Sequence, residues 1–169
     1  MAVGVFEMTE ASLDQFDANI LAELQNDARI SVAELARRIH LSQPAVRERV
    51  QKLEAAGIIR NFRTTVDARA LGYGIRAIMR VGRCDSGRIE RLIAKTPEVV
   101  TAFNITGEDS WMLEIAVVDV EHLESVVSRY CALAVTSTSI ILKALREHHP
   151  LRPASAPGIA ARATASVSP

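Results

Sequence analysis

Residues 31–53 read SVAELARRIHLSQPAVRERVQKL, and this pattern predicts two short helices joined by a tight turn. Ser31 and Glu34 have capping-box spacing, so we expect the first helix to begin near Ser31. Ser42 can cap the second helix, and Pro44 falls in its first turn, where a missing N–H and a fixed φ cost little. The second helix therefore begins at Gln43, and the first helix ends near His40 and Leu41.

The second helix has one apolar side. Val46, Val50 and Leu53 are spaced i, i+4 and i+7, which predicts a buried stripe. The remaining positions must point largely outward. These outward positions are Pro44, Ala45, Arg47, Glu48, Gln51 and Lys52.

A third helix and a small β element flank this pair. Asp14 can cap an upstream helix that has Asp17 in its first turn. Ile20, Leu21 and Leu24 supply the apolar face of this helix. Gly57 is a helix-stopping residue, and residues 58–66 are rich in β-formers and partly alternating. A small wing is expected there, so residues 13–66 have the pattern of a winged helix-turn-helix.

Charge is unevenly distributed along the chain, although the net charge of the 169 residues is zero. Residues 7–34 hold seven acids against one base, whereas residues 37–63 hold seven bases against two acids. A cationic helix of this type can enter the major groove of double-stranded DNA, and its phosphate contacts supply salt-dependent affinity. The predicted DNA-binding residues are Ser42, Gln43, Pro44, Ala45, Arg47, Glu48, Arg49, Gln51, Lys52, Arg60 and Arg63.

Within this set the residues have different expected roles. Arg47 is the best candidate for a base or phosphate contact, whereas Lys52, Arg60 and Arg63 are expected to neutralise phosphates. Arg49 lies closer to the buried stripe, and it either contacts DNA or pairs internally with Asp14 or Asp17. A plain solvated helix face is the alternative for residues 42–52.

Composition excludes several classes of protein. A hydrophobic fraction of 49% provides for real cores, and no apolar run approaches the roughly 18 residues of a membrane span. Cys84 and Cys131 have no CxxC or Cys/His spacing, so neither a disulfide framework nor a metal site is predicted. The adjacent His148 and His149 are expected to be solvated. We expect a cytoplasmic protein without an export signal.

The second half of the chain has a different periodicity. Residues 67–74 contain two glycines and no sustained period, which is typical of a linker. Strands are then predicted at 75–83, 99–106, 111–118 and from 135 to about 145, with helices at 85–95 and 120–131. The order βαββαβ is that of a ferredoxin-like domain, with both helices on one face of an antiparallel sheet.

Five segments follow from these patterns. They are an N-terminal extension (1–12), a winged helix-turn-helix domain (13–66), a linker (67–74), a ferredoxin-like domain (75–149) and a disordered tail (150–169). The fold class is α+β. Because the open face of the sheet needs cover, we predict a homodimer through the second domain.

The chain resembles the Lrp/AsnC family of transcriptional regulators over about residues 13–147. The resemblance is carried by Leu13-Asp14-x-x-Asp17-x-x-Ile20-Leu21-x-x-Leu24, by Leu41-Ser42-x-Pro44 leading to Arg49-Val50-x-x-Leu53-Glu54-x-x-Gly57-Ile58-Ile59, by Thr106-Gly107-Glu108, and by Thr136-x-Thr138-x-Ile140-x-Leu142. Several linked motifs in this order are more specific than a lone helix-turn-helix.

This resemblance implies a sequence-specific DNA-binding transcriptional regulator, assembled from dimers into tetramers or octamers. It also implies an effector, usually an amino acid, that binds between subunits of the second domain, and no other cofactor. The implied effector residues are Gly107, Glu108, Asp109, Ser110, Trp111, Thr136, Ser137 and Thr138. Relatives often have Asp at the position of Ser110, and here Asp109 stands one residue earlier.

A second function remains open at this point. The ferredoxin-like domain alone could serve as an amino-acid-binding sensor or a small enzyme, with the N-terminal helices used only for assembly. No Ser/His/Asp set, HExxH, P-loop or GxGxxG is visible in the sequence, so no catalytic residue is predicted.

Overall fold

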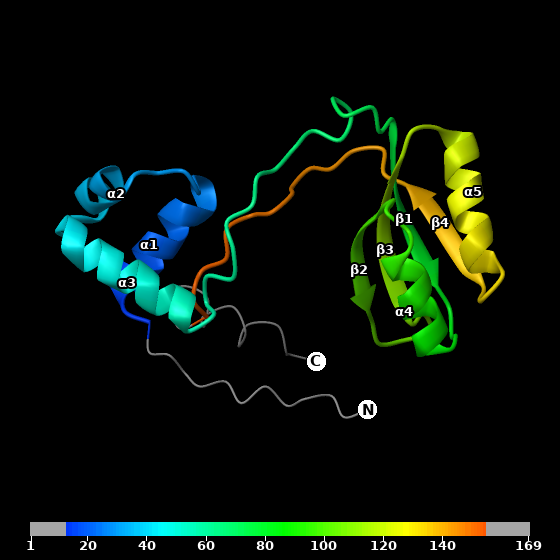
Figure 1. The fold of residues 1–169 in the computed structure, drawn as a ribbon, viewed down its shortest axis with the longest axis horizontal. Coiled ribbons are helices and arrows are strands. Elements are labelled where there is room, and N and C mark those ends of the chain that lie inside the picture. Colours follow the sequence, from blue (N-terminus) through cyan, green and yellow to red (C-terminus); the bar gives the residue numbers. More distant parts are fainter. Residues whose placement is uncertain (1–12, 155–169) are drawn as a thin grey trace, which may run out of the picture. The chain divides into compact units, whose positions relative to one another are not determined.

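The computed structural model describes residues 13–154, which divide into two compact units. The first unit comprises residues 13–64 together with residues 148–154, and the second comprises residues 65–147. The first unit contains three helices: α1 (Gln15–Asn26), α2 (Val32–Ile39) and α3 (Gln43–Ala55), shown in blue to cyan in Figure 1.

Each of these helices begins at the cap that the sequence predicts. Asp14 accepts a hydrogen bond from the backbone N–H of Asp17, whose carboxylate accepts one from the N–H of Asp14. The hydroxyl of Ser31 accepts from the N–H of Glu34, and that of Ser42 from the N–H of Ala45. The predicted capping box at Ser31 is therefore half formed, because the carboxylate of Glu34 binds two arginines instead of reaching back.

The core of the first unit lies where the three helices meet. Val46 and Leu53 from α3 are buried, and Val50 packs against them at partial exposure. Ile20 from α1 and Leu35 from α2 complete the centre of this cluster. Burying such side chains contributes about 1.5–3 kcal/mol each, which holds α3 with its opposite side facing solvent.

The prediction of a small β wing at residues 58–66 is wrong for this structure. No strand is assigned to residues 58–66, although Ile58 and Ile59 pack against the helical core and Phe62 and Val66 are exposed. The physical reason is pairing, since a β-forming segment needs a neighbouring strand for its N–H and C=O groups. In the part of the chain that the structure describes, nothing pairs with this segment.

The second unit is a four-stranded antiparallel sheet with two helices. Its strands are β1 (Ile75–Val81), β2 (Val99–Asn104), β3 (Trp111–Val117) and β4 (Thr136–Ile140), in the order β2-β3-β1-β4. The helices are α4 (Ser86–Ala94) and α5 (Val120–Cys131). This order confirms the ferredoxin-like prediction. β4 ends at Ile140, earlier than predicted, although Ile141 still donates a backbone hydrogen bond to Arg76.

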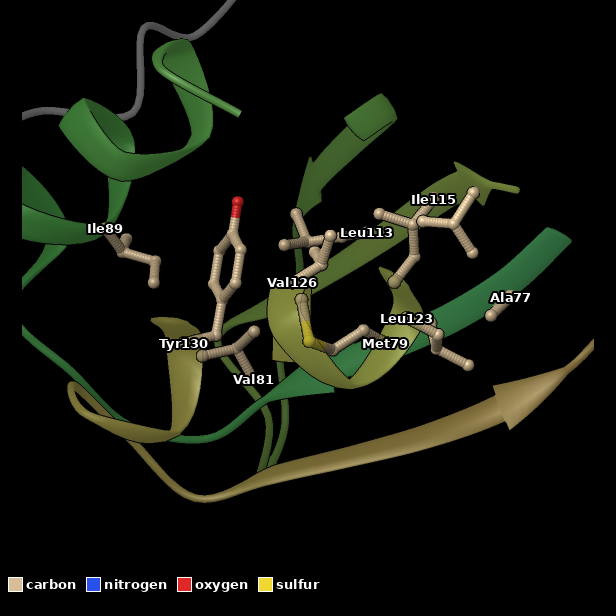
Figure 2. Close-up of a cluster of buried hydrophobic side chains, with 10 residues drawn as sticks. Ala77, Met79, Val81, Ile89, Leu113, Ile115, Leu123, Val126 and Tyr130 are labelled. Atoms are coloured by element: carbon tan, nitrogen blue, oxygen red, sulfur yellow. The ribbon is translucent and has the colours of Figure 1, made fainter. Parts of the chain in front are cut away.

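One face of this sheet forms the core with both helices. Met79 and Val81 from β1 and Leu113 from β3 pack against Val126 and Tyr130 from α5, as Figure 2 shows, and Ile89 joins them from α4. The opposite face carries apolar and charged side chains: Ile78, Met112 and Phe103 lie among Arg76, Arg80 and Glu114. Phe103 is 51% exposed, so this face has no apolar cover within the described chain.

The chain beyond the second unit returns to the first. Leu151 exchanges two hydrogen bonds with the side chain of Gln25 on α1. The N-terminal extension (1–12) and most of the predicted tail (155–169) lie outside the described residues, so the predicted disorder stays a prediction. Within residues 13–154, no helix has the length and apolar character needed to cross a membrane.

Candidate nucleic-acid interface and effector site

The solvent side of α3 carries most of the predicted DNA-binding residues. Ser42, Gln43, Pro44, Arg47, Glu48, Gln51 and Lys52 are exposed, and Ala45 is half-buried. Arg60 and Arg63 are exposed in the segment that follows α3. The sequence pattern therefore placed the apolar stripe and the polar side of α3 correctly.

Three charged side chains of this helix, Glu48, Arg49 and Lys52, already form ion pairs. Lys52 Nζ lies 2.7 Å from Glu48 Oε1, one turn away on the exposed face. A hydrogen bond from Lys52 lowers the pKa of Glu48. Arg49 Nη1 donates to Asp14 Oδ2 and to Asp17 Oδ1, both at 2.7 Å, and its guanidinium lies 5.4 Å from the centre of the Phe16 ring.

Of the two roles that the sequence left open for Arg49, the structure forms the internal one. The hydrogen bonds that Arg49 donates to Asp17 and then to Asp14 raise the pKa of Arg49, and its side chain is 29% exposed. Because its guanidinium is committed to two carboxylates at the start of α1, Arg49 ties α3 to α1. It thus helps to hold the orientation of α3, and a contact between Arg49 and DNA stays a prediction.

Gln43 and Arg47 differ from these neighbours. Among residues 13–154, no hydrogen bond or ion pair engages either side chain. Together with Pro44, they line a shallow hollow of about 430 Å³ at the N-terminal half of α3. A second hollow of about 500 Å³ lies between α1 and α3, lined by Ala45, Glu48 and Lys52 among others.

The loop between β2 and β3 contains four of the predicted effector residues, Gly107, Glu108, Asp109 and Ser110. Gly107 has a φ of +122°, a conformation that strongly favours glycine, and Glu108 beside it is exposed. The loop is anchored at Ser110, whose N–H donates to Val81 at 2.8 Å and whose carbonyl accepts from Ile105 and from the Asn104 amide. A fixed base with an exposed tip suits a binding loop.

Arg80 on β1 joins the two predicted effector segments, and the sequence analysis missed it. Its guanidinium Nε lies 3.8 Å from Asp109 Oδ2, and Nη2 donates to Ser137 Oγ at 3.4 Å. The signal was present in the sequence, since Arg76 and Arg80 occupy outward positions of a strand that is otherwise apolar. Only the pairing of β1 with β4 shows that Arg80 is opposite Ser137.

The predicted effector residues divide between the two faces of the sheet. Ser137 lies on the open face with Arg80, whereas Thr136 and Thr138 are paired with the core residues Val81 and Met79 and therefore face the helices. Trp111 is also paired with Val81. Thr136 Oγ1 lies 3.0 Å from Cys131 Sγ, but the hydroxyl of Thr138 and the indole N–H of Trp111 are buried without a partner among the described residues.

A separate cluster of polar side chains lies at the other end of β2. Glu98 Oε1 accepts from Arg129 and contacts His122 Nε2, both at 3.0 Å. Burial opposes ionisation of Glu98, but the hydrogen bonds from His122 and Arg129 prevail and lower its pKa. None of these residues was predicted as a site, and no group of three or more metal ligands is found in residues 13–154.

Two family models match this chain, one for each unit. The AsnC-type helix-turn-helix domain matches residues 13–54, and the Lrp/AsnC ligand binding domain matches residues 77–151. Together they cover more than half of the sequence, with the first on the three helices and the second on the sheet.

Two relatives agree with these matches. The chain is 37% identical over 131 residues to the HTH-type transcriptional regulator LrpC of Bacillus subtilis, a match that covers 76% of this chain and 91% of LrpC. It is 37% identical over 120 residues to the HTH-type transcriptional regulator Rv2324 of Mycobacterium tuberculosis, covering 69% of this chain and 81% of that protein. These names denote transcriptional regulators and not enzymes.

Solved structures show the same fold. The structure of B. subtilis LrpC has a TM-score of 0.75 at 35% identity and covers 79% of this chain and 97% of LrpC. The complex of the regulator NMB0573 from Neisseria meningitidis with L-Met has a TM-score of 0.78 at 27% identity and covers 85% of this chain and 98% of that protein. With both units, their order and these relatives in agreement, the chain belongs to the Lrp/AsnC family of transcriptional regulators.

Proposed function

We propose that this regulator binds operator DNA through the exposed side of α3 and that an amino acid bound by the second unit modulates this binding. The proposal depends on how α3 is held, with one side fixed to the rest of the unit and the opposite side exposed. Helix α3 is capped at Ser42, fixed to the core by Val46 and Leu53, and fixed to α1 by Arg49. Its opposite side, with Arg47 and Lys52, is exposed.

DNA binding through α3 has an electrostatic basis. Residues 37–63 carry a net of five positive charges, and the exposed Arg60 and Arg63 extend the cationic surface beyond the helix. Arg47 is proposed as the main contact, while Lys52, Arg60 and Arg63 neutralise phosphates. Lys52 can do so only by exchanging Glu48 for a phosphate, an exposed pair whose loss costs little.

An amino-acid effector is supported by chemistry and by a relative. The M. tuberculosis feast or famine regulatory protein Rv3291c, 27% identical with a TM-score of 0.77, has a solved structure in complex with L-methionine. In this chain the loop at Gly107 offers backbone N–H groups, Asp109 offers a carboxylate for an ammonium group, and Arg80 offers a guanidinium for a carboxylate. These groups match the two charged ends of an amino acid.

The open face of the sheet supports a homodimer. Ile78 and Met112 are paired with residues of neighbouring strands on this face, and Phe103 is half exposed beside Met112. A second copy of the same face would cover this apolar surface. Larger assemblies of dimers, tetramers or octamers, are proposed on the family resemblance.

Binding of the chain to its own upstream region, measured at several salt concentrations, tests the DNA proposal. We expect the affinity of the wild type to fall linearly with salt on a logarithmic plot and the affinity of Arg47→Ala to be much weaker. Arg88→Ala is the matched control, because Arg88 is an exposed cation of the second unit. Salt-independent binding, or equal losses in both variants, would contradict the proposal.

Thermal unfolding with each of the common amino acids tests the effector proposal. An amino acid at 100 times its Kd should stabilise the protein by about 2.7 kcal/mol. Arg80→Ala should remove this stabilisation, while Arg83→Ala, an exposed arginine just beyond β1, should retain it. If no amino acid raises the Tm of the wild type, the effector proposal is wrong and the DNA proposal is untouched.

A further inference from the structure

We infer that Gln43 and Arg47 are the residues that determine which DNA sequence this regulator selects, with Gln43 reading an adenine and Arg47 reading a guanine close to it. The inference rests on the proposed binding of DNA by α3 and goes further, since it assigns base contacts to two side chains. It follows from which groups on α3 are free, where they lie on the helix, and what their chemistry can recognise.

The first step is the state of the polar side chains on α3. Arg49 is bound to two carboxylates of α1, and Glu48 and Lys52 are bound to one another. Gln43 and Arg47 are exposed and have no side-chain partner among residues 13–154, and the same holds for Gln51 farther along α3. A base edge can therefore bind Gln43 and Arg47 without displacing an existing contact. A base that bound Glu48 would have to displace Lys52.

The second step is their place on the helix. Gln43 is the first residue of α3 and Arg47 follows one turn later, so both lie in the N-terminal half, the part of a recognition helix that contacts base edges. Residues four apart in a helix lie on the same side about 6 Å apart along the axis. Successive bases are about 3.4 Å apart, so the two side chains span about two base steps.

The third step is the surface between them. Gln43, Pro44 and Arg47 line the shallow hollow at the start of α3. Pro44 has no N–H and a fixed φ, which keeps this first turn rigid. The cap at Ser42 also consumes the N–H of Ala45. The two long side chains therefore supply the hydrogen-bonding groups at this surface.

The fourth step is recognition chemistry. A glutamine amide carries one acceptor and one donor side by side, which matches N6 and N7 of adenine in the major groove. The guanidinium of arginine carries two parallel donors, which match O6 and N7 of guanine. The site would thus contain an adenine and a guanine within about two base steps in each half-site.

Selection of random duplexes by the full-length protein tests this assignment. We expect the wild type to enrich a motif with an adenine and a guanine at this spacing. Gln43→Ala should lose the preference at the adenine, by roughly 5- to 150-fold between bases, and keep the guanine. Arg47→Lys retains the charge but not the two parallel donors, so it should lose the guanine preference with little change in salt dependence.

Lys52→Ala is the matched control on the same helix. Because Lys52 is assigned to phosphate, this variant should bind every duplex more weakly while selecting the same motif. A Tm equal to that of the wild type confirms that each variant is folded, which the exposure of all three positions favours.

The possible outcomes distinguish failure of the base assignment from failure of DNA binding. If the wild type enriches a motif that Gln43→Ala and Arg47→Lys leave unchanged, the base assignment is wrong while DNA binding by the protein stands. If the wild type enriches no motif at all, sequence-specific binding itself is wrong. A loss at the expected single position in each variant supports the assignment.

Discussion

The side-chain amide of Gln25 holds the backbone of Leu151, 126 residues later in the chain, through two hydrogen bonds. Gln25 Nε2 donates to the carbonyl of Leu151 at 2.9 Å, and the N–H of Leu151 donates to Gln25 Oε1 at 2.8 Å. The same Nε2 also donates to the carbonyl of Leu21 within α1. The end of the described chain is thereby fixed to the helix-turn-helix unit.

We therefore predict that Gln25→Ala releases this segment. Each of the two hydrogen bonds to Leu151 contributes about 1 kcal/mol, so their loss should make exchange of the Leu151 amide proton roughly thirtyfold faster. Gln15→Ala is the control, because Gln15 lies on the same helix and its side chain bonds, within residues 13–154, only to the exposed Asn19. Unchanged exchange at Leu151 in Gln25→Ala, measured by NMR, would show that the two bonds do not hold the segment.

Gly74 is predicted to tolerate no side chain. A Cβ at this position would lie 2.7 Å from the carbonyl oxygen of Val118, which is backbone and cannot move aside without distorting the sheet end. Gly74→Ala should lower the free energy of unfolding of the second unit by about 1–3 kcal/mol. Chemical denaturation followed by Trp111 fluorescence measures this change.

Gly87 supplies the control for that substitution. It lies in the first turn of α4, and an added Cβ would meet only side-chain atoms, at 3.5 Å. Gly87→Ala should leave stability unchanged or raise it by up to about 1 kcal/mol. Equal losses in both variants would mean that the contact with Val118 is not the cause.

Glu34 makes the free energy of unfolding of the first unit depend on pH in the acidic range. Hydrogen bonds from Arg37 and then Arg38 lower its pKa from 4.5 to about 2. Because the folded-state pKa is below the unfolded one, the stabilisation is complete above pH 4.5 and disappears as the pH falls towards 2. Glu34→Gln should therefore be less stable than the wild type at neutral pH, and the difference should shrink across this range.

Thermal unfolding at pH values from 7 to 2 measures this effect. Glu54→Gln is the control, because Glu54 is an exposed carboxylate of the same unit for which no ion pair is found within residues 13–154. If the Tm of the wild type and that of Glu34→Gln change in parallel with pH, the acid dependence of stability does not come from Glu34.

Thr138→Val is predicted to raise stability in the absence of an effector. The Thr138 hydroxyl is buried without a hydrogen-bond partner in the described chain, and an unpaired buried hydroxyl costs about 1–3 kcal/mol. Thr101→Val should do the opposite, because the Thr101 hydroxyl bonds to Glu114. If Thr138→Val lowers the Tm, the hydroxyl has a partner such as a bound water.

Local features of the sequence were sufficient for most of the fold. The caps at Asp14, Ser31 and Ser42 act on residues within one turn, and the period of Val46, Val50 and Leu53 fixes which side of α3 is buried. The alternation of strands and helices in the second half likewise implied the ferredoxin-like order, because few topologies bury both helices on one face. These signals depend on neighbours a few residues away.

Other features were decided by contacts between distant residues. The sequence left Arg49 with two roles, and the packing of α1 beside α3 chose the pairing with Asp14 and Asp17. Arg80 became a candidate effector residue only when β1 was found next to β4. The predicted wing at residues 58–66 is absent for the same reason, because a β-forming segment becomes a strand only where the fold places another strand beside it. Short-range hydrogen bonds and side-chain periodicity are encoded locally, but a partner 30 or more residues away is specified only by the folded chain.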